Sequence, residues 1–326
     1  MGVACTAEMR ITRRSALSAS LVFATWFASA SAQGPLRTPW GDPDLQGVWP
    51  SGNLIDVPFE RPVSFGTRAT LTEAEFAERA ATIRKQREAD AAESGDGGSG
   101  VNPASYWLER GQPSRQASLI VDPPDGRLPP MTADGAQRAR AWPSNDPPDG
   151  FASAAHFTVY ERCITRGVLG STFPNIYSSG MEIMQAPGLV VIRYEMIHES
   201  RIIPLDGRPP LAPSMRSYMG DPRGRWDGNT LVIETRNFNG KTGSYARNAN
   251  GNPTSEALTL VERFTRVGAD TLDYRVTVDD PRTWTRPWTV ALRLARDPAY
   301  VIHEYACHEG NYALVNMLRI SRAAER

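Results

Sequence analysis

The sequence predicts a mainly β protein, either an antiparallel meander barrel or a sandwich, with an irregular N-terminal segment that contains one or two helices. After about position 150, runs of β-branched and aromatic residues recur at roughly 10–15-residue intervals, separated by turn residues rather than by crossover helices. The 326 residues include 27 glycines and 26 prolines, which indicates many turns and disfavours a helix bundle.

Residues 1–32 have the three-part pattern of a secretory signal peptide. Basic residues within 10–14 precede the apolar run 16–27, and a small-residue cleavage site ends at Ala32. The run is shorter than the about 20 apolar residues that a membrane span needs. The adjacent arginines leave both the general and the twin-arginine export routes open. We therefore expect a periplasmic or secreted protein with no stable membrane insertion.

The segment 33–149 is expected to wrap a β-barrel-like domain at 150–326 rather than to form a core of its own. Its first part is rich in Pro and Gly, which indicates extended chain and turns. Thr72 and Glu75 form the capping-box pattern that opens a helix over about 72–92. The other elements expected in this segment are a short strand at 118–122 and a short helix at 133–141.

Within 150–326, strands are expected where apolar residues alternate with polar ones. Asp227-Gly228 and Gly268-Ala269-Asp270 are typical of tight connections between neighbouring antiparallel strands, and the stretch 224–229 is interpreted as a turn. The expected strands are 189–198, 201–205, 230–235, 257–266, 271–278, 288–294 and 300–307.

Two cysteines, Cys163 and Cys307, remain after removal of the signal peptide. Exported proteins encounter an oxidising compartment in which disulfides form and persist. We therefore expect these two residues to be bonded to each other, with two buried free thiols as the alternative.

Charge and motif content exclude several function classes. Lys plus Arg and Asp plus Glu both number 36, so the chain lacks the basic excess that nucleic-acid binding requires. It also lacks a Gly-x-Ser-x-Gly elbow, a phosphate loop, a dinucleotide fingerprint and a haem-attachment motif. We expect a small-molecule substrate or ligand, no nucleic-acid partner and no cofactor.

The densest group of chemically active residues is the stretch 303–312, which contains two of the four histidines. In a strand over 300–308, Glu304 and His308 share one face, with the small Ala306 between them. A carboxylate beside an imidazole orients the ring, as a general base requires. The pattern predicts His308 as the general base and Glu304 as its orienting partner, with a non-catalytic Glu/His pair as the alternative.

A second histidine candidate ends the strand expected at 189–198. Tyr194 and His198 fall on its more apolar face, where they would reach a cavity, whereas Arg193 and Glu195 fall on the other face as an ion pair. His198 is therefore a second catalytic candidate, and a structural histidine is the alternative.

Arg162, next to Cys163, and Tyr177, in a polar loop, are further candidates for contacts to the substrate or to an oxyanion, with ordinary polar surface residues as the alternative. Trp284 and Trp288 place two indole rings around Arg286. Such a group can stack on an aromatic or sugar ring, and plain packing is the alternative. The candidate substrate-binding residues are Tyr194, Trp226, Trp284 and Trp288.

A metal site is an open alternative. His303 and His308 are five positions apart, which does not match the His-Glu-x-x-His zinc motif. A metal-dependent enzyme would need His308 together with a distant ligand such as His198 or His156. We assign no metal ligand from the sequence.

Three phrases resemble those of a large family of exported bacterial proteins of unassigned function. They read IIPLDGRP at 202–209, GDPRGRWDGNTLV at 220–232 and EYACHEGNY at 304–312, and the opening WGDPDLQGVW at 40–49 belongs to the same pattern. The resemblance covers most of the mature chain and implies export, but it implies no reaction. The succession of short strands and turns also resembles that of lipocalin-like barrels. A fold by itself does not determine a function.

These observations together favour an exported, cofactor-independent enzyme. It would perform acid–base chemistry on a small, partly apolar molecule, aromatic or cyclic, as a lyase, isomerase or hydrolase. One alternative is a non-catalytic periplasmic carrier of a hydrophobic ligand. Another is a metal-dependent enzyme that uses His308 and His198. The sequence does not indicate the oligomeric state.

Overall fold

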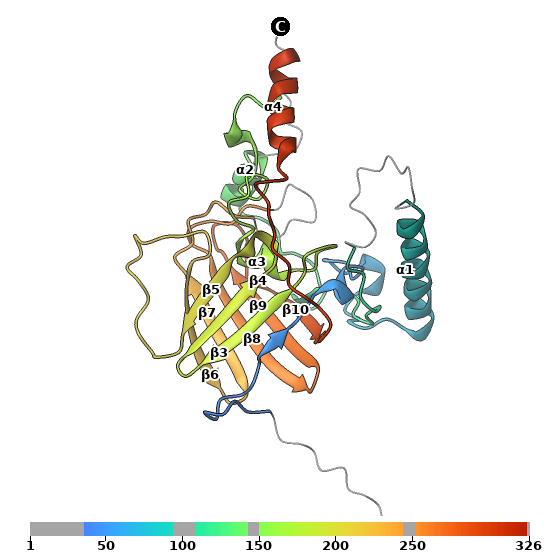
Figure 1. Ribbon diagram of the computed structural model, residues 1–326, viewed down its shortest axis with the longest axis vertical. Coiled ribbons are helices and arrows are strands. Elements are labelled where there is room, and N and C mark those ends of the chain that lie inside the picture. Colours follow the sequence, from blue (N-terminus) through green and yellow to red (C-terminus); the bar gives the residue numbers. More distant parts are fainter. Residues whose placement is uncertain (1–35, 94–107, 143–149, 244–251, 325–326) are drawn as a thin grey trace, which may run out of the picture. The chain divides into compact units, whose positions relative to one another are not determined.

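The structure of the protein is a computed structural model, which describes residues 36–93, 108–142, 150–243 and 252–324 (Figure 1). The signal peptide expected at 1–32 lies outside the described residues. None of the described helices is both long enough and apolar enough to cross a membrane.

Two antiparallel sheets form the β part of the molecule (Figure 1). In spatial order, the four-stranded sheet comprises β1 (Gly47–Val48), β3 (Met181–Ala186), β4 (Leu189–Tyr194) and β5 (Ser200–Pro204). The six-stranded sheet comprises β2 (Ile120–Asp122), β10 (Trp288–Ala295), β9 (Thr271–Asp279), β8 (Thr259–Gly268), β7 (Thr230–Arg236) and β6 (Asp221–Asp227). Consecutive strands β6 to β10 are neighbours, which confirms the predicted antiparallel meander.

The two sheets pack as a sandwich rather than as a closed barrel. Among the described residues, no hydrogen-bonded strand pair joins one sheet to the other. The sheets approach closely at Gly224 of β6, where an added Cβ would lie 2.4 Å from Leu205 and 2.8 Å from Ile203. A glycine at this position therefore allows the side chains of β5 and of the residue that follows it to lie against the β6 backbone.

The inner faces of both sheets form the hydrophobic core. Burial alternates along β9 and β10, as expected for strands with one buried face. Trp288 pairs with Val278 and Leu292 pairs with Tyr274 across the two strands, and all four are buried. β4 contributes Val190, Ile192 and Tyr194 from the other sheet.

A charged pair lies inside this core. Arg201 of β5 is 2% exposed and Glu262 of β8 is fully buried. The two Arg201 Nη atoms donate to the Glu262 carboxylate at 2.9 and 2.5 Å. Arg201 also donates to the hydroxyls of Tyr194 and Thr235, and Tyr274 donates to Glu262. This polar network joins the two sheets from within.

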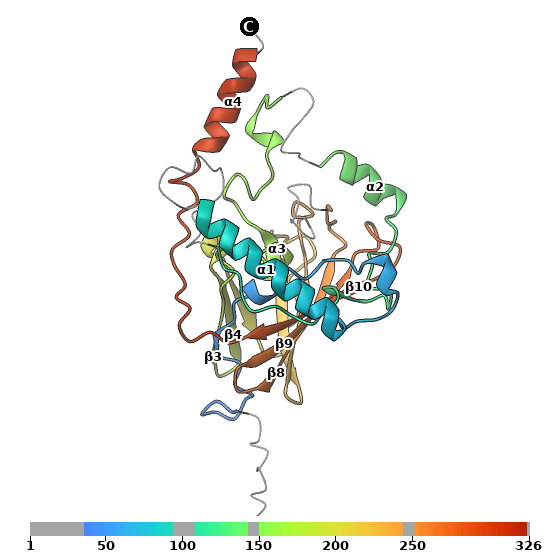
Figure 2. The same cartoon turned by 90° about the vertical axis from the view of Figure 1, so that its right-hand side faces the viewer.

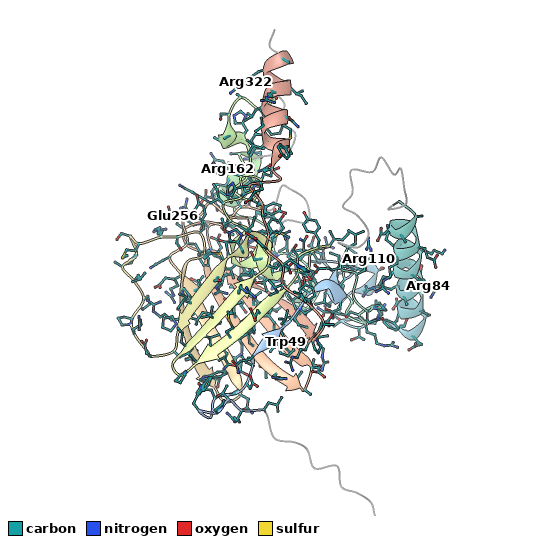
Figure 3. The ribbon with its side chains drawn as sticks, in the orientation of Figure 1. Trp49, Arg84, Arg110, Arg162, Glu256 and Arg322 are labelled. Atoms are coloured by element: carbon teal, nitrogen blue, oxygen red, sulfur yellow. A yellow bond between two sulfur atoms is a disulfide. The ribbon has the colours of Figure 1, made fainter. Side chains whose placement is uncertain are left out.

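The N-terminal part of the chain adds an edge strand to each sheet. β1 pairs with β3, and β2 pairs with β10. Trp49, labelled in Figure 3, directly follows β1 and is fully buried, with its Nε1 donating to the carbonyl of Leu45. These contacts anchor the segment against the β part.

Two predicted helices of this part are confirmed. α1 (Glu73–Glu93) begins with the expected capping box: the Thr72 amide donates to Glu75 at 2.8 Å, and the Glu75 amide donates to the Thr72 hydroxyl at 3.3 Å. α1 runs alongside the segment 110–116, to whose carbonyls Arg79 and Arg87 donate (Figure 2). α2 (Ala133–Arg140) is capped by the side chain of Thr132.

Several sequence predictions of local structure are wrong. The strand expected at 300–307 is extended chain and turn, with no strand partner. The strand expected at 189–198 ends at Tyr194, because Ile197 and His198 have φ values of 60° and 49°, which no strand accommodates. The stretch 224–229, expected to be a turn, lies largely in β6. Strand β3 and the helices α3 (Gly167–Thr172) and α4 (Tyr312–Ala324) were not expected from the sequence.

We predict that Glu262→Leu lowers the free energy of unfolding by about 3–5 kcal/mol, because it leaves the Arg201 charge buried without a partner. Urea denaturation of the purified variant measures the change. Arg263→Ala on the same strand is the control, since its exposed pair with Asp227 is worth at most about 1 kcal/mol. The double variant Arg201→Met/Glu262→Leu should recover most of the loss. Equal urea denaturation midpoints for Glu262→Leu and Arg263→Ala would contradict the prediction.

Candidate functional site

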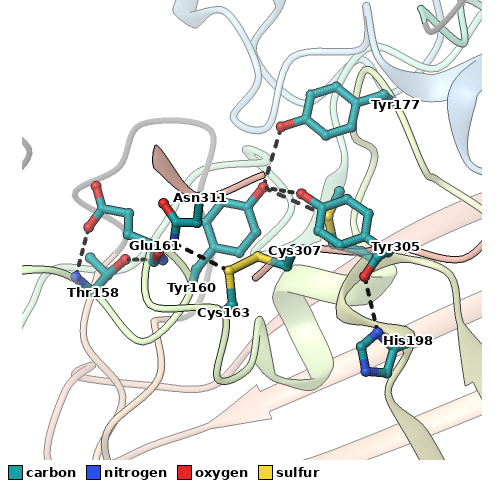
Figure 4. Close-up of a disulfide and its surroundings, with 10 residues drawn as sticks. Thr158, Tyr160, Glu161, Cys163, Tyr177, His198, Tyr305, Cys307 and Asn311 are labelled. Carbon is teal, nitrogen blue, oxygen red and sulfur yellow. Dashed lines mark hydrogen bonds between the residues drawn. A yellow bond between two sulfur atoms is a disulfide. The ribbon is translucent and has the colours of Figure 1, made fainter. Parts of the chain in front are cut away.

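Four segments meet at a disulfide bond (Figure 4). Cys163 is bonded to Cys307 with a Cα–Cα distance of 5.7 Å, which confirms the predicted pairing. We call the surrounding segments 158–166, 175–180, 195–199 and 300–311 the junction.

The C-terminal segment of the junction is held by contacts from two of the other segments. His198 Nδ1 lies 3.1 Å from the Tyr305 carbonyl oxygen, and the His303 amide donates to Glu195 at 3.4 Å. Asn311 donates to the Glu161 carbonyl at 2.7 Å. Side-chain contacts and the disulfide therefore replace a strand ladder in placing this segment.

Three tyrosine hydroxyls converge in the junction (Figure 4). The Tyr160 hydroxyl lies 3.4 Å from that of Tyr177 and 3.4 Å from that of Tyr305. The Arg166 guanidinium carbon lies 5.0 Å from the centre of the Tyr160 ring, and Arg166 also donates to Asn175. We call Tyr160, Tyr177 and Tyr305 the tyrosine cluster.

The phenols of the tyrosine cluster are neutral at physiological pH. Burial raises the pKa of all three, and that of Tyr177 to about 12; the positive charge of Arg166 only partly offsets this effect. Each phenol therefore keeps a proton that it can donate. The 3.4 Å separations exceed the usual 2.7–2.8 Å of O–H···O bonds, so the hydroxyls bond each other weakly.

Two arginine donors next to the disulfide add polar groups that the protein does not satisfy. Within the described part of the chain, the Nε atoms of Arg162 and Arg166 are buried and have no hydrogen-bond partner. A buried donor without an acceptor costs about 1–3 kcal/mol. Arg162, labelled in Figure 3, and Arg166 share this feature with Arg201 Nε and Trp288 Nε1 in the core.

Backbone strain gathers at the junction. Among the described residues, five that are not glycine have positive φ, and four of them lie in the junction. These four are Cys163 (55°), Ser178 (50°), Ile197 (60°) and His198 (49°). Such conformations cost about 1–3 kcal/mol each and cluster at active sites and ligand sites, because surrounding contacts must enforce them. The strain marks the junction as a candidate functional site independently of its side chains.

The carboxyl groups of Glu109 and Glu195, which we call the acidic pair, lie beside the tyrosine cluster. The Tyr300 hydroxyl is 2.8 Å from Glu109 Oε1 and 2.6 Å from Glu195 Oε2. Burial, and secondarily the charge of Glu109, raise the pKa of Glu195. Gly180 makes room for this arrangement, because an added Cβ would lie 2.6 Å from the Tyr300 ring and 2.8 Å from Glu195. This group was not expected from the sequence, because its members are far apart in the chain.

The predicted catalytic residues occupy different environments. Tyr177 belongs to the tyrosine cluster, Arg162 lies next to the disulfide, and His198 is exposed with its Nδ1 at the Tyr305 carbonyl. Glu304 and His308 are exposed, and the strand that was to give them a common face is absent. Their catalytic roles stay predictions without geometric support.

The predicted substrate-binding residues lie mostly in the core. Trp284 and Trp288 are buried and pack edge to face, with their ring centroids 6.1 Å apart. This geometry matches the alternative in which the two indoles serve packing. Tyr194 is fully buried, with its hydroxyl between Thr172 and Arg201. Trp226 is partly buried against the same core. The ion pair expected between Arg193 and Glu195 is wrong, because Arg193 pairs with Glu182 across the sheet.

A metal centre finds no ligand set in the part of the chain that the structure describes. No group of three or more His, Cys, Asp and Glu side chains there is placed to hold a metal ion. The His198 and His308 alternative therefore gains no support from geometry.

Comparisons of the chain with protein-family models, with curated proteins and with solved structures find no match. The interpretation of the junction therefore rests on its own geometry and chemistry.

We predict that Cys163→Ser and Cys307→Ser each lower the free energy of unfolding by about 5 kcal/mol, because the bond closes a loop across a sequence separation of 144. Denaturant titration under oxidising conditions measures the loss. The double variant should match either single variant. Losses that differ widely between the two single variants would show that the bond itself is not the cause.

We predict that Gly180→Ala destabilises the protein by about 1–3 kcal/mol, since the new methyl group overlaps Tyr300 and Glu195. Thermal unfolding measures the effect. Gly310→Ala is the matched control in the same junction, because nothing lies within 4 Å of its added Cβ, and it should change stability by less than about 0.5 kcal/mol. A Gly180→Ala protein as stable as the control would contradict the arrangement described for Tyr300.

Proposed function

We propose that this protein is an exported acid–base enzyme that acts on a small, partly apolar, carbonyl-bearing molecule, aromatic or cyclic, without a cofactor. The observation that carries the proposal is the convergence of three neutral phenols beside the Arg166 guanidinium. Lyase, isomerase and hydrolase reactions on such molecules share one requirement, which is the stabilisation of a developing oxyanion.

The tyrosine cluster suits this requirement. Neutral phenols donate hydrogen bonds to an oxyanion without themselves adding negative charge, and a partly buried position strengthens each bond. Tyr160 is the central donor, since its hydroxyl faces those of Tyr177 and Tyr305. The disulfide and the strained backbone hold these donors in place before a substrate binds, as preorganised stabilisation requires.

His198 is the proton acceptor that the geometry favours. A carbonyl oxygen only accepts hydrogen bonds, so the contact with Tyr305 assigns the ring proton to Nδ1. Nε2 is then the basic nitrogen of an exposed ring. His308 is the second candidate, on the sequence pattern alone.

The carrier alternative receives less support. A carrier of a hydrophobic ligand needs a large apolar cavity, whereas side chains from both inner sheet faces belong to one packed core cluster. The Arg201–Glu262 pair at its centre is also poorly suited to an apolar ligand.

Export to the periplasm or the exterior is part of the proposal. The disulfide supports it, because such bonds persist in oxidising compartments. The signal pattern at 1–32 and the resemblance to exported bacterial proteins point in the same direction.

We predict that Tyr160→Phe lowers kcat about 10²–10³-fold on a substrate found by screening, because it removes one oxyanion donor. The mature protein from residue 33 is screened for turnover of small aromatic esters and lactones, with and without chelator. Tyr312→Phe is the control, since that side chain is 73% exposed.

Three outcomes would overturn the proposal. Full turnover by Tyr160→Phe would remove the tyrosine cluster from the mechanism. A compound that stabilises the protein but is not consumed would favour the carrier. Turnover that chelator abolishes would favour the metal-dependent enzyme.

A further inference from the structure

The single hydroxyl hydrogen of Tyr300 cannot make both of its short contacts with the acidic pair. The Tyr300 hydroxyl lies within hydrogen-bond distance of both Glu109 and Glu195, yet it carries one hydrogen. Ionised carboxylates accept hydrogen bonds and donate none. A second hydrogen must therefore lie on one of the two carboxyl groups if both short contacts are hydrogen bonds.

The surroundings of the two carboxyl groups decide which one carries it. Glu109 accepts from the Ser178 amide at 2.6 Å, from the Ser179 amide at 2.9 Å and from the Ser179 hydroxyl at 2.6 Å. These three donors stabilise a negative charge. Glu195 is 4% exposed and accepts, besides the Tyr300 contact, from the His303 amide at 3.4 Å. Glu109 is therefore the charged partner and Glu195 the neutral one.

We infer that Glu195 holds a proton in the folded protein, donates it to Tyr300, and thereby fastens the C-terminal segment to the turn that presents His198. Tyr300 in turn donates to Glu109. Glu195 is a positioning residue, because it acts on the tyrosine cluster through Tyr300 and the chain that leads to Tyr305. The protonation of Glu195 stands without the proposed function, whereas its role in positioning a catalytic site rests on that function.

This arrangement predicts that the junction loosens as the pH rises. Burial, and then the Glu109 charge, raise the pKa of Glu195 above its ordinary 4.5, while Tyr300 and the charge of His303 act in the opposite direction. The folded state then binds more protons than the unfolded state, so the contribution of Glu195 is complete below pH 4.5 and is lost as the pH rises through the raised pKa. Glu109, His303, Tyr300 and His198 are the titratable groups around it.

Two isosteric variants separate the roles of the carboxyl groups. Glu195→Gln reproduces a protonated carboxyl, because its amide donates to Tyr300 while its oxygen still accepts from His303. Glu109→Gln places an amide NH₂ against backbone amides, which are obligatory donors. We expect Glu195→Gln to keep the junction intact at every pH, and Glu109→Gln to disrupt it.

Hydrogen exchange of the His303 amide in the full-length mature protein is the measurement. We expect its protection factor to fall at least tenfold in the wild type as the pH is raised through the Glu195 transition, and to stay constant in Glu195→Gln. Glu109→Gln should lack this protection at all pH values. Infrared difference spectra between wild type and Glu195→Gln should show the band of a protonated carboxyl in the wild type.

The inference is overturned if Glu109→Gln is the tolerated variant, if the protonated-carboxyl band is absent, or if wild type and Glu195→Gln share one pH dependence of protection. None of these measurements needs a substrate, so a failure of this inference can be distinguished from a failure of the proposed function. With a substrate in hand, the alkaline limb of the kcat profile should shift to higher pH in Glu195→Gln. An unshifted limb would remove its positioning role while leaving the protonation intact.

Discussion

The disulfide between Cys163 and Cys307 is the constraint on which the junction depends. Strands β3 to β10 all lie between the two cysteines in the sequence, so the bond closes a covalent ring around most of the β part. The segment 300–307 has no strand ladder of its own. Its position comes from this bond, from contacts with the turn that follows β4, and from the contacts of Tyr305 with Tyr160 and of Tyr300 with Glu109. A covalent tie of this kind suits an exported protein, because it lasts where thiols are oxidised.

Two buried carboxyl groups meet the same physical problem in different ways. Burial of a carboxylate is costly unless a counter-charge or a proton neutralises it. In the core, Glu262 is neutralised by the two-point contact with Arg201. At the junction no arginine reaches Glu195 among the described contacts, and its partners are a phenol and an amide. A charge pair thus joins the sheets, whereas a proton joins the C-terminal segment.

The tyrosine cluster sits where several costly features coincide. Strained backbone, unsatisfied guanidinium donors and weakly bonded phenols would each be removed by simple substitutions in a protein that needed only stability. Their coincidence at one junction is what a site that binds an acceptor from outside requires. The inner faces of the sheets have a different composition, with large apolar side chains packed around the Arg201–Glu262 pair.

The sequence alone determined the elements whose signals are local. The capping box at Thr72 and the two-residue connection at Gly228 depend on a few adjacent residues, and the alternation in β8 to β10 depends on a repeating period. The expectation of export predicted the pairing of Cys163 with Cys307. The tertiary structure decided the rest. The segment 300–307 alternates like a strand but has no neighbour to pair with, and Glu109, Tyr300 and Glu195 are brought together across separations of 105 and 191 residues. Contacts over such distances arise from packing of the whole chain, and no local pattern encodes them.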